Sequence, residues 1–208
     1  MHNVTPSSSL PMVGRRRRAL TFAVLAVATW GLGACSSAPS PAFDLTAPRL
    51  AVRGGGGIAG QLVVAEPSAI QPLEAERILA RDAAGSVSYI SGAQWADRLP
   101  RLIQARLLQT FENATRIRAV ARPGEGVTAE YQLNTDIRAF QLDAARGEAV
   151  VEISAKVLDA RTGKIVNARV FSARTPVSDS AGGTVAQALD RVLSGVLLDI
   201  VRWVGARG

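Results

Sequence analysis

The clearest pattern in the sequence lies at residues 131–170, which read YQLNTDIRAFQLDAARGEAVVEISAKVLDARTGKIVNARV. Apolar and polar residues alternate over most of this stretch, and a period of two is typical of a strand with one buried and one solvated face. Two polar segments that contain glycine, at residues 143–147 and 160–164, interrupt the alternation. Such segments favour tight turns, so we predict three long strands joined as an antiparallel meander.

The alternation shifts by one residue at Phe140 and Leu142. An extra residue in a strand moves the following side chains to the opposite face, so we expect a bulge or a second covered surface at this point. On this interpretation Phe140, Leu142 and Phe171 lie opposite the main apolar stripe of the meander. They are therefore candidates for contact with a partner protein, and packing under nearby loops is the alternative.

Two segments outside the meander have the period of an amphipathic helix. Apolar residues recur every three or four positions within residues 95–111 and again within residues 185–203. Pro100 is tolerated only in the first turn of a helix, so the first helix should begin near Pro100, after a turn that contains Trp95. Each helix and the meander has one apolar face. We therefore predict an α+β domain of two layers, with a mainly antiparallel sheet and both helices packed on one of its faces.

Two tryptophans, Trp95 and Trp203, lie near the ends of the predicted helices. A tryptophan at such a position either fills space in the core or leaves part of its indole exposed on a docking surface. Both interpretations stay open for these two residues. Together with the three meander residues named above, they are the candidate partner contacts of the chain.

The N-terminal region has the order of charged, apolar and small residues of a bacterial export signal. Four arginines at residues 15–18 precede an apolar run at residues 19–32, which is shorter than the roughly 20 residues that a membrane-spanning helix needs. The run closes with Leu32-Gly33-Ala34-Cys35, which resembles a lipobox and implies covalent lipid on Cys35 after cleavage. The alternatives are a plain cleavable signal and an ordinary core helix with a buried Cys35 thiol.

These features divide the chain into three parts. Residues 1–34 are the predicted lipoprotein signal peptide, whose true start is either Met1 or Met12. Residues 35–60 are a lipidated N-terminus with a short first strand and a flexible tether, rich in proline, serine and glycine. Residues 61–208 are the predicted globular domain.

The residue after Cys35 is Ser36. In enteric bacteria an aspartate at this place retains a lipoprotein in the inner membrane, so by resemblance we expect sorting to the periplasmic face of the outer membrane. Anchoring in the inner membrane is the alternative, because the sorting rule differs between bacterial groups. Two acyl chains are enough for stable attachment.

The composition of the predicted mature chain excludes several classes of function. The one histidine of the full chain, His2, lies in the predicted signal, so the mature chain has none. Cys35 is the only cysteine. Ser-His-Asp and Cys-His catalysis, histidine-ligated metals and disulfides are therefore excluded. We predict no catalytic residue, no metal and no cofactor other than the lipid on Cys35, and a carboxylate-dependent enzyme such as a glycosidase is the remaining enzymatic alternative.

The net charge does not indicate a nucleic-acid partner. The whole chain has a formal charge of +7, but without the four arginines of the signal it carries 20 basic against 17 acidic residues. A small excess without a large basic cluster is not typical of a protein that binds phosphate backbones.

The order of several motifs resembles a known family. After the lipobox come FDL at residues 43–45, LVVAEP at 62–67, YISGAQWADRL at 89–99 and YQL at 131–133. This order is similar to that of the ABC-type transport auxiliary lipoproteins, the PqiC-like group, over about residues 43–205. The resemblance implies a periplasmic, membrane-tethered accessory subunit, not an enzyme, in an Mce-type transport system that moves phospholipid or similar apolar cargo.

The partners implied by the resemblance are a membrane, through the lipid anchor, and an Mce-domain protein of an ABC transporter. A homo-oligomer is also compatible with the sequence. The chain lacks a phosphate-binding loop of the Walker type, so ATP hydrolysis would belong to a partner. Two alternatives stay open: a pilot or assembly lipoprotein for a secretin or for lipopolysaccharide export, and a protein that carries lipid between its sheet and helices.

Overall fold

The computed structural model of the chain describes residues 2, 40–49, 60–114 and 119–206. Cys35, the signal and most of the predicted tether lie outside the described residues. The strands and helices below therefore belong to the unit that begins at Ser40.

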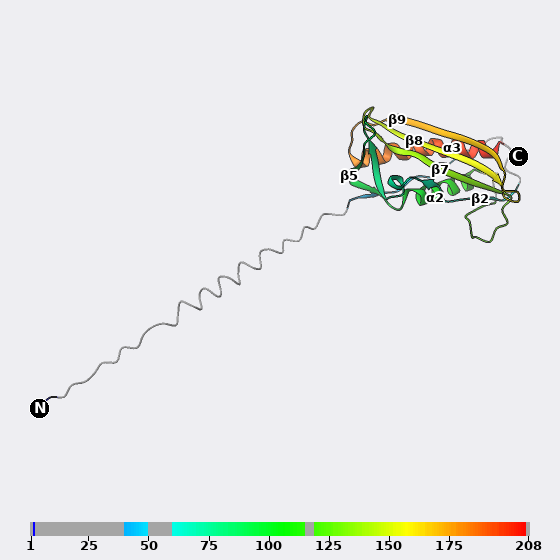
Figure 1. Cartoon of the computed structure of the whole chain (residues 1–208), viewed down its shortest axis with the longest axis horizontal. Coiled ribbons are helices and arrows are strands. Elements are labelled where there is room, and N and C mark those ends of the chain that lie inside the picture. Colours follow the sequence, from blue (N-terminus) through cyan, green and yellow to red (C-terminus); the bar gives the residue numbers. More distant parts are fainter. Residues whose placement is uncertain (1, 3–39, 50–59, 115–118, 207–208) are drawn as a thin grey trace. The chain divides into compact units, whose positions relative to one another are not determined.

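The meander forms as predicted from the alternating pattern. Its strands are β7 (Tyr131–Asp143), β8 (Glu148–Asp159) and β9 (Ile165–Pro176), and both pairings between them are antiparallel. Figure 1 shows the three strands side by side, with α3 running along them. The register shifts between Ile137 and Ala139, which confirms the predicted bulge.

Local chemistry explains the two turns of the meander. Asp143 and Asp159 each accept hydrogen bonds on Oδ1 from backbone N–H groups two or three residues further on. Gly147 and Gly163 then take positive φ values of 64° and 68°, a conformation that costs glycine little. Aspartate at the start and glycine at the end of each loop are thus the residues that the turns require.

Strand β7 is paired along both edges. One edge faces β8, and the other is paired in turn with three short parallel strands, β2 (Leu62–Val64), β3 (Ser68–Ala69) and β4 (Arg77–Arg81). The sheet is completed by β1 (Ala42–Phe43), β5 (Val87–Trp95) and β6 (Val120–Ala121).

The sheet is more mixed than the sequence predicts. Among the described residues it has nine strands, and five of its eight pairings are parallel. The long ladders β7–β8 and β8–β9 are antiparallel, so most paired residues follow the predicted direction. The prediction of a mainly antiparallel sheet therefore describes the meander but misses the parallel arrangement around β7. The parallel pairings involve segments of two to five residues, which are too short to show a period.

The described part of the chain contains two α-helices, as predicted. Helix α2 (Leu99–Asn113) has Pro100 in its first turn, and α3 (Gly182–Gly205) follows β9. Trp95 does not lie in a turn, which corrects the prediction: it is the last residue of β5 and is almost completely buried. The 3-10 helix η2 (Gln71–Leu73) connects β3 and β4.

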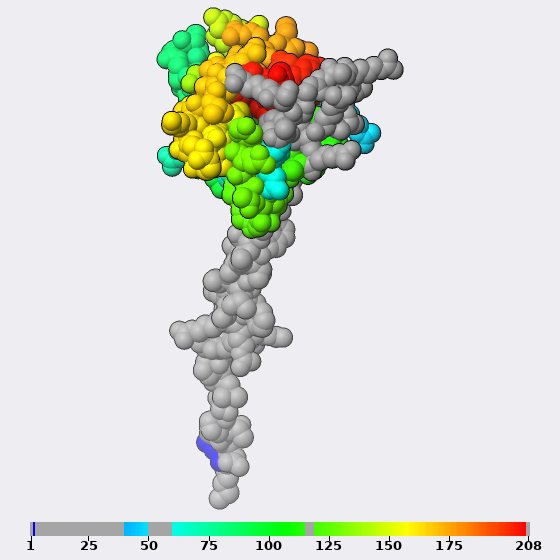
Figure 2. Space-filling model, turned by 90° about the vertical axis from the view of Figure 1, so that its right-hand side faces the viewer, coloured from blue at the N-terminus to red at the C-terminus, as the bar shows by residue number. Residues whose placement is uncertain are grey.

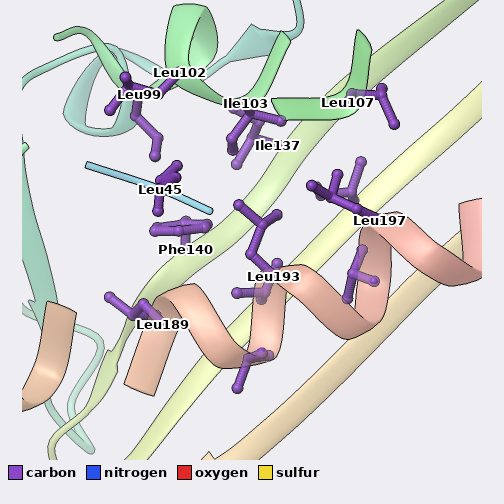
Figure 3. Packing of buried hydrophobic residues seen from close by; sticks show 14 of the residues in the cluster. Leu45, Leu99, Leu102, Ile103, Leu107, Ile137, Phe140, Leu189, Leu193 and Leu197 are labelled. Carbon is purple, nitrogen blue, oxygen red and sulfur yellow. The ribbon is translucent and has the colours of Figure 1, made fainter. Parts of the chain in front are cut away.

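The two helices and the sheet share one hydrophobic core. Figure 3 shows that side chains of α2 and α3 point toward each other and toward Ile137 and Phe140 of β7. The buried residues on the helices include Leu99, Ile103, Leu107, Leu189, Leu193 and Leu197. No helix among the described residues is long and apolar enough to span a bilayer.

We predict opposite effects for the same substitution at two glycines of α3. A Cβ added at Gly182 would overlap the Cβ of Ala93 on β5, whereas a Cβ at Gly195 meets no atom within 4 Å. Gly182→Ala should therefore destabilise the domain by about 1–3 kcal/mol through overpacking. Gly195→Ala should stabilise it by about 0.5–1 kcal/mol, because alanine favours the helix.

Urea unfolding of the unlipidated chain that begins at Ser36 measures both effects. Equal shifts of the two variants in the same direction would contradict the close packing of α3 on β5.

Candidate functional site

The described chain begins with a segment that is built into the domain. We call residues 40–49 the strap. Its strand β1 pairs in parallel with the end of β5. The Gln94 N–H donates to the Pro41 carbonyl at 3.1 Å, and the Ala96 N–H donates to the Phe43 carbonyl at 2.8 Å. The strap is thus joined to the edge of the sheet through its backbone.

The strap also contributes a side chain to the core. Leu45 is 3% exposed. Figure 3 shows Leu45 between Leu99 and Leu102 of α2 and Phe140 of β7, with Leu189 of α3 on the other side. Removing one large aliphatic side chain from such a position leaves a cavity that the surrounding elements fill only partly. Leu45 therefore links the strap to both helices.

Two carboxylates fix the strap on either side of Leu45. Asp190 of α3 accepts hydrogen bonds from the Thr46 backbone N–H at 2.6 Å and from the Thr46 hydroxyl at 2.8 Å. Asp44 forms an ion pair with Arg106 of α2, whose side chain is mostly buried. Helix α3 therefore holds the strap through the acceptor Asp190, and α2 holds it through the donor Arg106.

The ion pair shifts the ionisation of Asp44. Partial burial alone would raise its pKa, but hydrogen bonds from Arg106 and from the Leu45 N–H, with the charge of Arg106, lower the pKa below its ordinary value of 3.8. A carboxyl whose pKa is lower in the folded state stabilises that state above its unfolded pKa, and the contribution is lost as the pH falls through the folded pKa. The Asp44 contact is therefore fully formed at neutral pH.

The surface of the described domain includes a hollow beside the strap and another beside α2. One borders the strap and is lined by Asp44, Thr46, Arg49, Arg106, Gln109 and Glu112. The other lies beside the first half of α2 and is lined by Glu66, Asp97, Arg101, Leu102, Gln104 and Arg122. Charged side chains of both signs border each hollow, whereas a site for acyl chains is lined mainly by apolar residues. Neither hollow supports the alternative of a lipid carrier.

The described residues do not form a recognisable catalytic or metal site. No three acidic, histidine or cysteine side chains among them are placed to hold a metal ion. Among the described acidic groups, the pKa is shifted at Asp44, Asp159 and Asp179, and it is lowered in each. Hydrogen bonds lower it at Asp159 and Asp179, and at Asp44 they outweigh the effect of burial, which raises it. A general acid would instead need a raised pKa.

Four of the five candidate contact residues are buried. Trp95 and Phe140 are 1% exposed and lie edge to face with ring centroids 5.5 Å apart. Leu142 and Phe171 are also buried. The face predicted for the three meander residues was wrong. The bulge before Ala139 absorbs one residue and returns Phe140 and Leu142 to the helix-covered face. Phe171 pairs directly with the buried Ile153 of β8 and therefore lies on the same face. In the folded domain these side chains are not available to a partner.

Trp203 is the one candidate that stays partly exposed. It lies near the end of α3 and contacts the ring of Phe171 edge to face, with centroids 5.5 Å apart. Its contact with a partner remains a prediction. The proposed lipid site, Cys35, lies outside the described residues.

Sequence reasoning missed the strap contacts at Asp190 and Arg106. Asp190 is 144 residues from Thr46, and no local pattern connects them. The available signal was the FDLT segment at residues 43–46, where an apolar residue lies between polar ones in a stretch otherwise typical of a tether.

Comparison with known proteins supports this architecture. The family described as ABC-type transport auxiliary lipoprotein component matches residues 43–201. Protein XCC0632 from Xanthomonas campestris has a similar crystal structure, with 28% identity, a TM-score of 0.73, and coverage of 79% of this chain and 95% of that one. A second crystal structure, of an uncharacterized protein, is 12% identical with a TM-score of 0.60 over 76% of this chain and 95% of that one, and shares the fold alone.

A curated relative is the uncharacterized protein bll6063 of Bradyrhizobium diazoefficiens. It is 30% identical over 166 residues, which are 77% of this chain. The match spans 44% of the relative's own length, so the chain corresponds to less than half of that protein.

We predict that Leu45→Ala destabilises the domain by about 2–5 kcal/mol, the usual cost of a large-to-small change at a buried leucine or isoleucine. The matched control is Ile165→Ala on β9, where the side chain is 57% exposed. The control should change the free energy of unfolding by no more than about 0.5 kcal/mol. Urea denaturation of both variants measures the difference, and equal costs would show that the strap does not contribute to the core.

Proposed function

The chain belongs to the family of ABC-type transport auxiliary lipoprotein components, and from this premise we propose that it is the membrane-tethered accessory subunit of an Mce-type transport system. Its cargo would be phospholipid or a similar apolar molecule. The lipid on Cys35 would hold the domain at the periplasmic face of the outer membrane, and the domain would dock a partner subunit. We propose no catalytic step for it.

The observation that carries this proposal is the strap. Five residue steps separate Cys35 from Ser40, where the described segment begins. An extended chain covers at most 3.6 Å per residue, so this connection reaches no further than about 18 Å. From Pro41 onward the chain is bonded to β5, α2 and α3. A lipid anchor on Cys35 would therefore hold the folded domain close to the bilayer surface, and a pull on the anchor would act on the core.

The surface chemistry is consistent with a docking role. Both hollows carry charged side chains of both signs, which are typical of a polar interface rim. Near α2, Nη1 of Arg98 lies 3.5 Å from Oε1 of Glu66, and Nη2 of Arg98 lies 3.3 Å from Oε2 of Glu74. These ion pairs fix the positions of three charged side chains on this surface. Exposed pairs of this kind contribute little to stability, whereas charges that face a complementary partner surface add selectivity.

Affinity purification of the lipidated protein from a detergent extract of its native host tests the proposal. We expect the Mce-domain protein to be enriched, with the ATPase and permease of the same system recovered to a lesser extent. The matched control is the same domain exported behind a cleavable signal without the lipobox, which should be released into the soluble periplasmic fraction. Recovery of the wild-type protein without any Mce-type component would contradict the proposed function.

A further inference from the structure

The last strand of the meander leaves one edge open from Ala168 to Arg174. Strand β9 spans twelve residues, and its only strand partner among the described residues is β8. An edge strand presents a row of N–H and C=O groups that can bind the backbone of another chain. Proteins usually protect such an edge by keeping it short or by placing proline or charged residues along it.

The direction of the free backbone groups follows from one hydrogen bond and the register. The Val177 N–H donates to the Gly147 carbonyl at 2.8 Å, so these two residues are a hydrogen-bonded pair. Bonded and non-bonded pairs alternate along an antiparallel ladder. The register from Glu148–Pro176 to Lys156–Ala168 is continuous. The residues that direct their N–H and C=O groups away from β8 are therefore Ala168, Val170, Ser172 and Arg174, followed by Pro176, which has no N–H.

The position of Pro176 agrees with this assignment. Proline occurs in a sheet where no ladder hydrogen bond is needed, and Pro176 lies at an outward position. The preceding residues of β9 contain no proline. At the middle of the strand, Val170 is 44% exposed and is flanked by the small residues Ala168 and Ser172 on the same face. Residues 168–174 thus present an open edge with small or exposed side chains, and a second strand could pair with it.

Charge indicates which kind of strand would pair. Residues 160–178 contain four basic residues, Arg161, Lys164, Arg169 and Arg174, and no acidic residue. Of these four residues, Arg174 alone lies within ion-pair distance of a described carboxylate, with its Nη1 3.7 Å from Oε2 of Glu148. Two copies of β9 placed edge to edge would bring these like charges together, which is unfavourable. An acidic segment would instead be attracted.

An aromatic contact surface borders the same edge on the helix side. The Arg169 guanidinium lies over the ring of Phe171, 5.0 Å from its centroid, and Trp203 contacts the same ring edge to face. Trp203 is only partly buried. Figure 2 shows the end of the domain where β8 turns into β9 (yellow), with the last part of α3 (red) beside it. A partly exposed indole and a cation that both contact one buried ring suit a segment that carries apolar and acidic residues.

We propose that the free edge of β9 binds an extended segment of a partner subunit, which adds to the sheet as a further strand. The segment has an acidic residue beside Arg169 and an apolar residue that packs on Trp203 or Val170. Main-chain hydrogen bonds at Val170 and Ser172 supply affinity, and the charges supply selectivity. The inference rests on the proposed function, since it identifies where the transport partner docks.

The first test separates the backbone from the side chain at Ser172. Ser172→Pro removes an outward N–H without removing a hydrogen bond to β8, and Ser172→Thr keeps the N–H. With the full lipidated chain as bait, the proline variant should recover at least about tenfold less of the Mce-type partner than the wild type, and the threonine variant should recover a similar amount. Equal recovery by Ser172→Pro and the wild type would overturn the proposal.

The second test uses charge and does not depend on the folding of a proline variant. Arg169→Glu should reduce recovery of the partner strongly. Arg191→Glu, an equal change of charge at an exposed residue of α3, is the matched control and should leave recovery unchanged. Equal losses in both variants would show that net charge, and not the β9 edge, matters.

A third measurement identifies the occupant. A photo-cross-linking residue at position 168 should form an adduct with an extended segment of the transport partner that contains Asp or Glu. Amide hydrogen exchange in residues 168–174 should slow at least tenfold in the complex. An adduct between two copies of this chain, or unchanged exchange with the partner bound, would overturn the proposal. In either case recovery of the partner by the wild type would leave the proposed function intact, whereas its absence would contradict the proposed function itself.

Discussion

The two helices depend on a side chain that neither of them supplies. Leu45 fills the space between α2, α3 and β7, and it comes from the segment nearest to the predicted lipid site. Because Thr46 and Asp44 are held by the two helices on either side of it, the leucine cannot withdraw without loss of polar contacts as well. The strap, which would connect the proposed anchor at Cys35 to the domain, therefore also completes the core.

Strand β7 organises the sheet around this core. Its thirteen residues pair with β8 along one edge and with β2, β3 and β4 along the other. This arrangement pairs β7 along most of one edge and over three short stretches of the other, and it leaves β9 as a long strand at the end of the meander. The strap and the open edge thus lie on different strands of one continuous sheet.

The long, periodic elements could be predicted from the sequence, and the short ones could not. Three strands of twelve or thirteen residues and two helices repeat their pattern often enough to be recognised. The bulge was also predictable, but the face of Phe140 was not. If the extra residue stays in register, the side chains after it switch faces, whereas if it forms a bulge, as at Arg138, they stay on the original face. The contact of Thr46 with Asp190 depends on tertiary packing, and a sequence period carries no information about it.

The proposed lipid-anchored docking subunit, with its anchor fixed to the core, is tested most directly at the N-terminus of the mature protein. The measurement is mass spectrometry of the N-terminal peptide of the protein purified from membranes of its native host. We expect a peptide that begins at Cys35 and carries acyl chains. A mature N-terminus at another residue, or an unmodified Cys35 thiol, would contradict it.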